Sequence, residues 1–152
     1  MIDAPVPPAH THPERELVTA RHFPFPRAAL LDAFRDGARL ARWWGPAGFT
    51  NDFEVFEPRP GGLWRFTMIG PDGARYANEC RFIGLGPDRV VIRHIPWPRF
   101  DLAVTLDDVP GGTRLGWCQR FDTEETCDKV KGIAEPANEE NLDRLEAELR
   151  RG

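Results

Sequence analysis

The sequence predicts an α+β fold in which a curved antiparallel sheet of about seven strands wraps around one long C-terminal helix. Short apolar runs recur about every ten residues between residues 49 and 121, and Gly, Pro and Asp turns separate them. A strand-like run and two short helical segments precede this region, and a long stretch with helical spacing of leucines follows it. Links this short join antiparallel neighbours, because a parallel crossover needs about a dozen residues or more.

The first elements follow from the N-terminal part of the chain. Residues 1–14 are rich in proline and lack apolar periodicity, so we expect a flexible leader followed by a single domain over residues 15–152. Glu16–Phe23 is predicted to form the first strand. Pro26 suits the first position of a short helix, because its missing N–H would be unpaired there. Asp36 is expected to cap a second short helix, and both segments carry apolar residues at helical spacing.

Further strands are expected in the region of short apolar runs. They span Phe49–Phe56, Leu63–Ile69, Arg75–Leu85, Arg89–Ile95, Phe100–Leu106 and Thr113–Phe121. Apolar and polar side chains alternate along these runs, so that Trp64, Phe66 and Met68, for example, share one face of their strand. A sheet with one apolar face needs a second layer to cover that face.

The C-terminal residues are predicted to supply this cover as a long amphipathic helix. Asp122, followed three residues later by Glu125, has the form of a capping box at its start. Pro136 is expected to break the helix, because proline removes a backbone hydrogen bond and clashes with the preceding turn. Glu140 and Arg144 stand at positions i and i+4, so we expect them to pair on the outer side.

Composition excludes several classes of protein. The formal net charge is -4 and no Lys/Arg cluster is present, so nucleic acid is not an expected partner. No apolar run approaches the roughly 20 residues of a membrane helix, so no membrane partner is expected either. The N-terminus lacks the basic and apolar regions of a secretory signal. The 3 cysteines lack C-x-x-C spacing and are expected to be reduced, which favours a cytoplasmic protein.

Four motifs carry a resemblance to a known family. They are the segment from Phe25-Pro26 to Trp43-Trp44-Gly45-Pro46, then Pro58-Arg59-Pro60-Gly61-Gly62, then Gly70-Pro71-Asp72-Gly73, and Leu142-Asp143-Arg144-Leu145 in the last helix. Their order resembles the START-like, or SRPBCC, superfamily, and within it the branch named after the activator of heat-shock-protein-90 ATPase homologue. The resemblance covers about Arg15 to Leu149. It implies the helix-grip (START-like, Bet v-like) fold, with a cavity between the long helix and the concave sheet.

The resemblance leaves the function open, because members of this superfamily include lipid carriers, hormone receptors, aromatic-polyketide cyclases and a co-chaperone domain. The favoured hypothesis is a protein that binds a small hydrophobic ligand, aromatic or lipid-like, in the cavity. One alternative is a cyclase/aromatase-like enzyme that uses the same cavity. Another is a co-chaperone-like protein-interaction module that uses an exposed Trp97 loop and a Trp43-Trp44 ledge. A homodimer is also left open.

The candidate cavity residues are those on the apolar parity of the strands, together with the tryptophan pair at one end. They are Trp43, Trp44, Trp64, Phe66, Met68, Tyr76, Asn78, Phe82, His94, Leu102, Trp117, Gln119 and Phe121. This set is mostly apolar with a few polar groups, as ligand pockets are. Gln119 or Tyr76 is expected to orient the ligand, and Gln119 could equally be a satisfied amide of the core.

No catalytic residue is assigned, and the sequence favours a binding protein over an enzyme. The chain contains no serine, which excludes serine hydrolase chemistry. His, Cys and Asp do not occur at metal-ligand spacing, so neither a metal site nor a cofactor is predicted. Asp52, Glu54, Tyr76 and His94 are the acids and bases that a cyclase-like reaction could use, and spacing distinguishes none of them.

Overall fold

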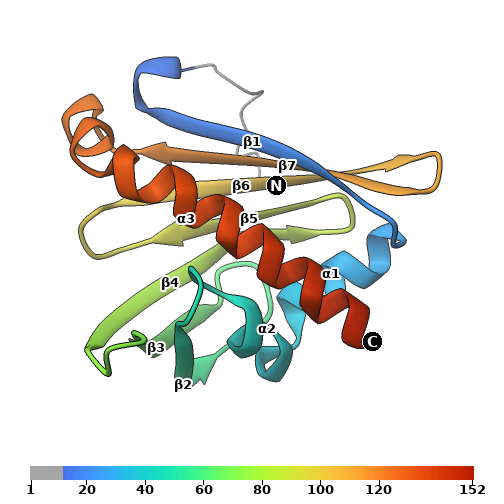
Figure 1. Ribbon diagram of the computed structural model, residues 1–152, viewed down its shortest axis with the longest axis horizontal. Coiled ribbons are helices and arrows are strands. Elements are labelled where there is room, and N and C mark those ends of the chain that lie inside the picture. Colours follow the sequence, from blue (N-terminus) through green and yellow to red (C-terminus); the bar gives the residue numbers. More distant parts are fainter. Residues whose placement is uncertain (1–11) are drawn as a thin grey trace.

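A curved antiparallel sheet, with the long helix α3 lying across its concave face, dominates the computed structural model, which describes residues 12–152 (Figure 1). The predicted leader lies outside these residues except for its last three positions. In chain order the elements are η1 (Pro13–Arg15), β1 (Glu16–Phe23), α1 (Arg27–Arg35), α2 (Gly37–Trp43), β2 (Thr50–Phe56), β3 (Leu63–Ile69), β4 (Arg75–Gly86), β5 (Arg89–His94), β6 (Phe100–Val109), β7 (Gly112–Phe121) and α3 (Glu124–Arg151). No helix in the described part of the chain is long and apolar enough to cross a membrane.

The sheet confirms the predicted meander. Its strand order is β1-β7-β6-β5-β4-β3-β2, so β2 to β7 follow one another in space and β1 pairs with the last strand. Every neighbouring pair is antiparallel. The register shifts between Phe53 and Val55 in β2, and between Phe82 and Gly84 in β4. Such irregularities bend strands, and they assist the curvature of the sheet around α3.

The two short helices begin close to the predicted positions. Pro26 has an extended backbone (φ -68, ψ 153) and precedes α1 as its N-cap, so the helix starts at Arg27, one residue later than expected. The Asp36 side chain caps α2 as predicted. Its Oδ1 accepts hydrogen bonds from the backbone N–H groups of Ala38 (3.0 Å) and Arg39 (3.2 Å).

The predicted capping box of α3 is wrong by one residue. The N-cap is Thr123, whose Oγ1 accepts a hydrogen bond from the backbone N–H of Thr126 at 3.0 Å. Asp122 is held elsewhere, because its backbone N–H donates to the carbonyl of Arg99 at 3.1 Å. This bond ties Asp122 to the loop before β6 and occupies the N–H group that Glu125 would accept in the predicted capping box.

The predicted break at Pro136 is also wrong, since α3 is continuous from Glu124 to Arg151 with Pro136 inside it. Buried side chains anchor the helix on both sides of this proline. Cys127 packs against Leu17 and Phe121 near the N-terminal end, and Leu142, Leu145 and Leu149 belong to the main core. These contacts offset the hydrogen bond that Pro136 removes.

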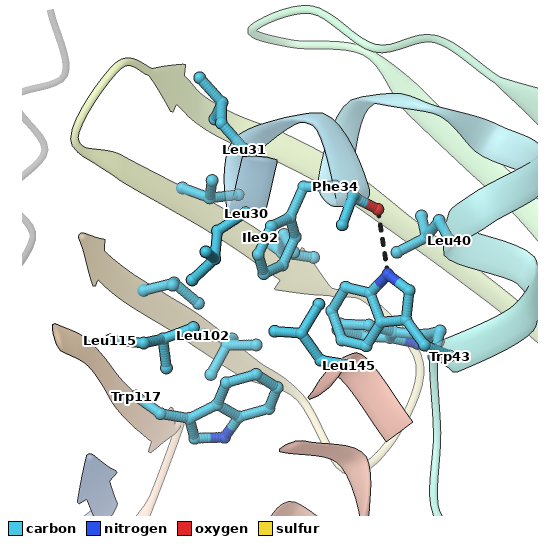
Figure 2. Close-up of a cluster of buried hydrophobic side chains, with 14 of the residues drawn as sticks. Leu30, Leu31, Phe34, Leu40, Trp43, Ile92, Leu102, Leu115, Trp117 and Leu145 are labelled. Carbon is cyan, nitrogen blue, oxygen red and sulfur yellow. Dashed lines mark hydrogen bonds between the residues drawn. The ribbon is translucent and has the colours of Figure 1, made fainter. Parts of the chain in front are cut away.

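The main core lies between the concave face and helices α1, α2 and α3 (Figure 2). Trp43 is fully buried, and its Nε1 donates to the carbonyl of Ala33 at 3.0 Å, drawn as the dashed line in Figure 2. The edge of its ring system meets Phe34, with ring centroids 5.0 Å apart and planes at 87°. This packing joins α1 to α2 and positions the loop that follows Trp43.

Candidate functional site

A cavity of about 140 Å³ lies between the concave face of the sheet and the middle of α3. The loop between α2 and β2 closes one end, strands β3 to β7 form the floor, and α3 forms the opposite wall. The lining residues are Trp44, Gly45, Pro46, Met68, Asn78, His94, Phe100, Leu102, Trp117, Gln119, Ala137, Asn138 and Asn141. A larger groove of about 510 Å³ lies at the β4–β5 hairpin, but no aromatic or amide side chain lines it.

The predicted cavity residues divide into two groups. Those that line the cavity are Trp44, Met68, Asn78, His94, Leu102, Trp117 and Gln119. Those that lie elsewhere are Trp43, Trp64, Phe66, Tyr76, Phe82 and Phe121. The second group contains core side chains and one exposed side chain, and these two kinds are absent from the cavity wall for different reasons.

The core members of the second group pack against one another in the hydrophobic core and do not line the cavity. Trp64 is fully buried, and its ring centroid lies 5.0 Å from that of Phe82 and 5.7 Å from that of Phe56. Phe66 stacks on Phe53 at 4.7 Å with an interplanar angle of 15°. These rings pack directly against one another. Strand alternation identifies the face of a side chain, but not how closely its neighbours pack around it.

Tyr76 is not a cavity residue, because its side chain is 49% exposed. It pairs with Met68 across the β3–β4 hairpin, close to the turn, which Figure 1 shows projecting away from α3. Its ring lies 6.2 Å from that of Phe49. The role in ligand orientation that we predicted for Tyr76 therefore has no geometric support.

His94 lies in the cavity wall with both ring nitrogens engaged. Nδ1 is 2.7 Å from the carbonyl oxygen of Pro98, Nε2 is 2.7 Å from the side-chain amide of Asn78, and the ring stacks on Phe100 at 4.7 Å. Burial lowers the pKa of His94, and hydrogen bonds to the carbonyls of Pro98 and Pro96 offset only part of this shift.

The lowered pKa makes the His94 ring neutral at pH 7, because even the unperturbed value is about 6.5. Nδ1 then carries the proton and donates to Pro98. Nε2, which faces Asn78 Oδ1, becomes an acceptor, so a hydrogen bond here requires the flipped orientation of the Asn78 amide, with its NH₂ group toward the ring. His94 is thus a fixed, uncharged wall residue that offers no free nitrogen as a base.

Gln119 is a partly satisfied amide at the cavity, since its Oε1 accepts a hydrogen bond from Asn138 Nδ2 at 2.9 Å. Asn141, on the next turn of α3, donates from Nδ2 to the carbonyl of Trp43 at 2.7 Å. We did not predict either asparagine as a site residue. A signal was present, because both interrupt the apolar stripe of α3 at positions that face the sheet.

The loop that closes the cavity is held by Arg144 of α3. Its Nη1 donates to the carbonyls of Trp44 (3.1 Å), Gly45 (3.0 Å) and Pro46 (2.9 Å). Its Nη2 donates to two more carbonyls in the same region, at 2.8 Å each. The predicted outer pair of Glu140 and Arg144 is therefore wrong, because Arg144 turns inward to the loop.

Glu140 contacts the same loop, where its Oε1 accepts the backbone N–H of Ala47 at 3.0 Å. The predicted Trp43-Trp44 ledge is not a surface, because Trp43 is 0% and Trp44 8% exposed. Trp97 is exposed as expected, at 64%. A singly exposed aromatic side chain does not make an interaction surface.

Little in the site supports catalysis. Asp52 and Glu54 point outward from β2 and do not line the cavity, and Tyr76 is exposed. His94 is the one candidate acid or base that lines the cavity, and its nitrogens are both hydrogen-bonded. Between residues 12 and 152, no group of three His, Cys, Asp or Glu side chains is arranged to hold a metal ion.

Solved structures from several bacteria share this fold. A protein from Rhodobacter sphaeroides is 28% identical with a TM-score of 0.79, and the match covers 91% of this chain and 93% of that chain. A protein from Arthrobacter aurescens is 22% identical with a TM-score of 0.84, over 92% and 88% of the two chains. An AHSA1 protein from Silicibacter pomeroyi is 22% identical with a TM-score of 0.69, over 90% and 98%.

No curated protein matches the sequence. The model of one family, described as activator of Hsp90 ATPase homolog 1-like protein, matches residues 24–150, which is nearly the whole domain. This match agrees with the motifs of the sequence and with the sheet and helices of the structure, and it confirms the START-like fold. The chain therefore belongs to the family of activator of Hsp90 ATPase homolog 1-like proteins.

Proposed function

We propose that the protein binds a small hydrophobic ligand in the cavity between the sheet and α3. The observation that carries this proposal is the lining itself, in which Trp44, Phe100, Leu102 and Trp117 surround a few placed amides. Binding sites for small molecules combine an apolar wall with a small number of polar groups in this way. The absence of a usable acid–base set in the same lining favours binding over the cyclase-like alternative.

The volume of the cavity favours an aromatic ligand over a lipid-like one. Pockets for drug-sized ligands are about 300–1,000 Å³, whereas a cavity of about 150 Å³ holds one benzene ring. At about 140 Å³, this cavity is matched to a single ring. Burying roughly 150–200 Å² of ring surface at about 25 cal/mol per Å² contributes about 4–5 kcal/mol. We therefore expect a Kd near 1 mM for a bare ring.

Titration with single-ring compounds, followed by amide and indole chemical shifts in NMR spectra, tests this proposal. We expect saturable shifts at Trp44 and Trp117, which line the cavity. Ala137→Phe should abolish them, because Ala137 lies in the wall and a phenyl group would fill the space. Ala147→Phe is the matched control, since Ala147 is an exposed position on the same helix. The proposal would be refuted if both variants bound the ring compounds equally well. It would also be refuted if no ring compound bound to the wild-type protein.

A further inference from the structure

We infer that the ligand of this cavity is an uncharged ring compound that carries a hydrogen-bond donor, a hydroxyl or N–H group, and that Asn141 Oδ1 accepts this hydrogen bond. This class of ligand narrows the proposed function and rests on it. Three observations support it: an acceptor that the wall of the cavity leaves unpaired, a second amide close to that acceptor, and a lining without charge.

Asn141 is a buried amide with only one half in use. The residue is 6% exposed and lines the cavity, and its Nδ2 donates to the carbonyl of Trp43 at 2.7 Å. A carbonyl can only accept, so this bond fixes the NH₂ group toward Trp43 and leaves Oδ1 on the other side of the amide. Oδ1 accepts no hydrogen bond from the described residues.

Access to Oδ1 distinguishes Asn141 from other unpaired groups. Among the described residues, the buried side-chain atoms without a partner are Asn51 Oδ1, Trp64 Nε1 and Trp117 Nε1, and packing seals each of them. Asn141 Oδ1 is not one of these atoms, so it keeps accessible surface. Because the residue is otherwise buried and lines the cavity, this surface faces the cavity. A ligand that displaced water from Oδ1 without replacing its hydrogen bond would lose affinity.

The amide of Gln119 lies close to Asn141 and fits the same ligand group. Its Oε1 accepts from Asn138 Nδ2 at 2.9 Å, and Asn138 and Asn141 are neighbours at positions i and i+3 of α3. Gln119 Nε2 has no partner among the described residues and is not a sealed atom. A hydroxyl group can donate to Asn141 Oδ1 and accept from Gln119 Nε2. Reversing both amides of the Gln119–Asn138 pair would present Oε1 instead, so the ligand needs a donor in either orientation.

The lining disfavours a charged donor. No Asp, Glu, Lys or Arg lines the cavity, and burial lowers the pKa of His94 and keeps its ring neutral. An ammonium group would lose its hydration here without meeting a carboxylate, which is strongly unfavourable. A neutral hydroxyl or N–H group has less hydration to lose and regains a hydrogen bond at Oδ1.

Phenol and fluorobenzene form the matched pair of probes for this inference. They have nearly the same size, but only phenol carries a donor, and it is uncharged at pH 7 because the ordinary pKa of such a hydroxyl, as in tyrosine, is about 10. NMR titration gives the ratio of the Kd of fluorobenzene to the Kd of phenol. Asn141→Leu keeps the approximate shape of the side chain and removes the acceptor, so it should lower this ratio about tenfold. In the wild-type protein, phenol should shift the side-chain amide signals of Asn141 more than fluorobenzene does.

Asn51→Leu is the matched control. Asn51 also donates from Nδ2 to carbonyls of the α2 region, those of Ala41 at 3.0 Å and Trp44 at 2.8 Å. Its Oδ1 is sealed, however, and the residue does not line the cavity. Asn51→Leu therefore loses hydrogen bonds of the same kind as Asn141→Leu, and it should keep the ratio of the wild-type protein.

The outcomes separate the two proposals. If neither ring binds, the proposed function fails together with this inference. If fluorobenzene binds and phenol does not, if Asn141→Leu leaves the ratio unchanged, or if phenol binds without moving the Asn141 signals, the inference fails and the binding function stands. These signals are measured on the wild-type protein, so they remain decisive if Asn141→Leu does not fold. Tighter binding of benzylammonium than of phenol would refute the requirement for an uncharged ligand.

Discussion

Arg144 gives the sharpest test of what holds the loop between α2 and β2 that closes one end of the cavity. Its guanidinium lies between α3 and residues 42–49, where it serves five backbone carbonyls at 2.8–3.1 Å. Two of these carbonyls, those of Arg42 and of the C-cap Trp44, lie at the C-terminal end of α2, where a helix leaves its last carbonyls unpaired and carries partial negative charge. Arg144→Met keeps the length and the apolar stem of the side chain and removes every donor. We expect this variant to fold and to be clearly less stable.

The expected loss follows from the geometry. Nη1 and Nη2 together offer four N–H groups, and a net contribution of about 1 kcal/mol for each hydrogen bond gives about 4 kcal/mol. Part of this is offset, because burial lowers the pKa of Arg144 and so shows that holding a cation there is unfavourable. Water can also reach some of the carbonyls after the substitution. We therefore expect the free energy of unfolding to fall by about 3 kcal/mol, and Tm to fall by roughly 10 °C.

Urea denaturation followed by tryptophan fluorescence measures this change, with Arg150→Met as the control. Arg150 is an exposed residue of the same helix, and it pairs with Glu146 at 2.7 Å. Exposed pairs of this kind contribute little, so the control should lie within about 0.5 kcal/mol of the wild type. Arg144→Lys keeps the charge but not the planar fork, and should fall between the two. If Arg144→Met is as stable as Arg150→Met, the loop is not held by these hydrogen bonds and the reasoning is wrong.

Three further predictions concern other parts of the structure. Glu148 is 3% exposed between arginines of α2, and hydrogen bonds from these arginines lower its pKa. In urea denaturation at pH 7, Glu148→Gln should lower the free energy of unfolding by about 2 kcal/mol. This difference from the wild type should shrink as the pH falls below the ordinary glutamate pKa of about 4.3, because the carboxylate then takes up a proton. Burial raises the pKa of Cys118 to about 12, so iodoacetamide at pH 8 should label this thiol in urea and not in the folded protein, and equal rates would contradict its burial. Gly61→Ala should lower the free energy of unfolding by about 1 kcal/mol, because φ is +81° and the space around the position is open. Gly62→Ala should lower it by on the order of 3 kcal/mol, because a Cβ there would clash with the Glu57 carbonyl. Thermal unfolding measures both variants, and a smaller loss for Gly62→Ala than for Gly61→Ala would overturn this order.

The strands could be predicted closely because their signals are local. Alternation of side chains and the chemistry of the turns depend on residues that are neighbours in the sequence. The predicted runs Glu16–Phe23 and Leu63–Ile69 coincide with β1 and β3. β6 continues to Val109, past the predicted end at Leu106, and pairs there with Gly112 of β7. A strand end of this kind depends on the partner strand, which local pattern does not describe.

Helix ends and breaks were less predictable because two local signals competed. Asp122 and Thr123 are both good N-cap residues, and the bond from the Asp122 N–H to the carbonyl of Arg99 occupies the group that the predicted capping box would use. Pro136 is a strong local signal for a break, yet packing on both sides keeps α3 continuous. In both places a contact distant in the sequence outweighs the local preference.

For the candidate site, the sequence by itself determined which side chains face inward. The parity of Met68, His94, Trp117 and Gln119 along their strands requires that they lie on the covered face. The same reasoning applied equally to Trp64 and Phe82, which belong to the core. The family, the fold and most of the inward-facing strand residues could therefore be obtained from the sequence, whereas Tyr76, which was predicted to face inward, is exposed.

Only the tertiary structure decided which of these residues surround a space. That space exists where α3, the loop after α2 and the sheet fail to meet, and its position depends on how three distant segments pack. The same packing directs Arg144 toward the loop between α2 and β2, where it donates hydrogen bonds to backbone carbonyls, whereas the sequence predicted an outer ion pair with Glu140. It also left the Trp117 N–H without a partner among residues 12–152. Periodicity describes one segment at a time, whereas cavity volume, donor pairing and burial are properties of several segments together.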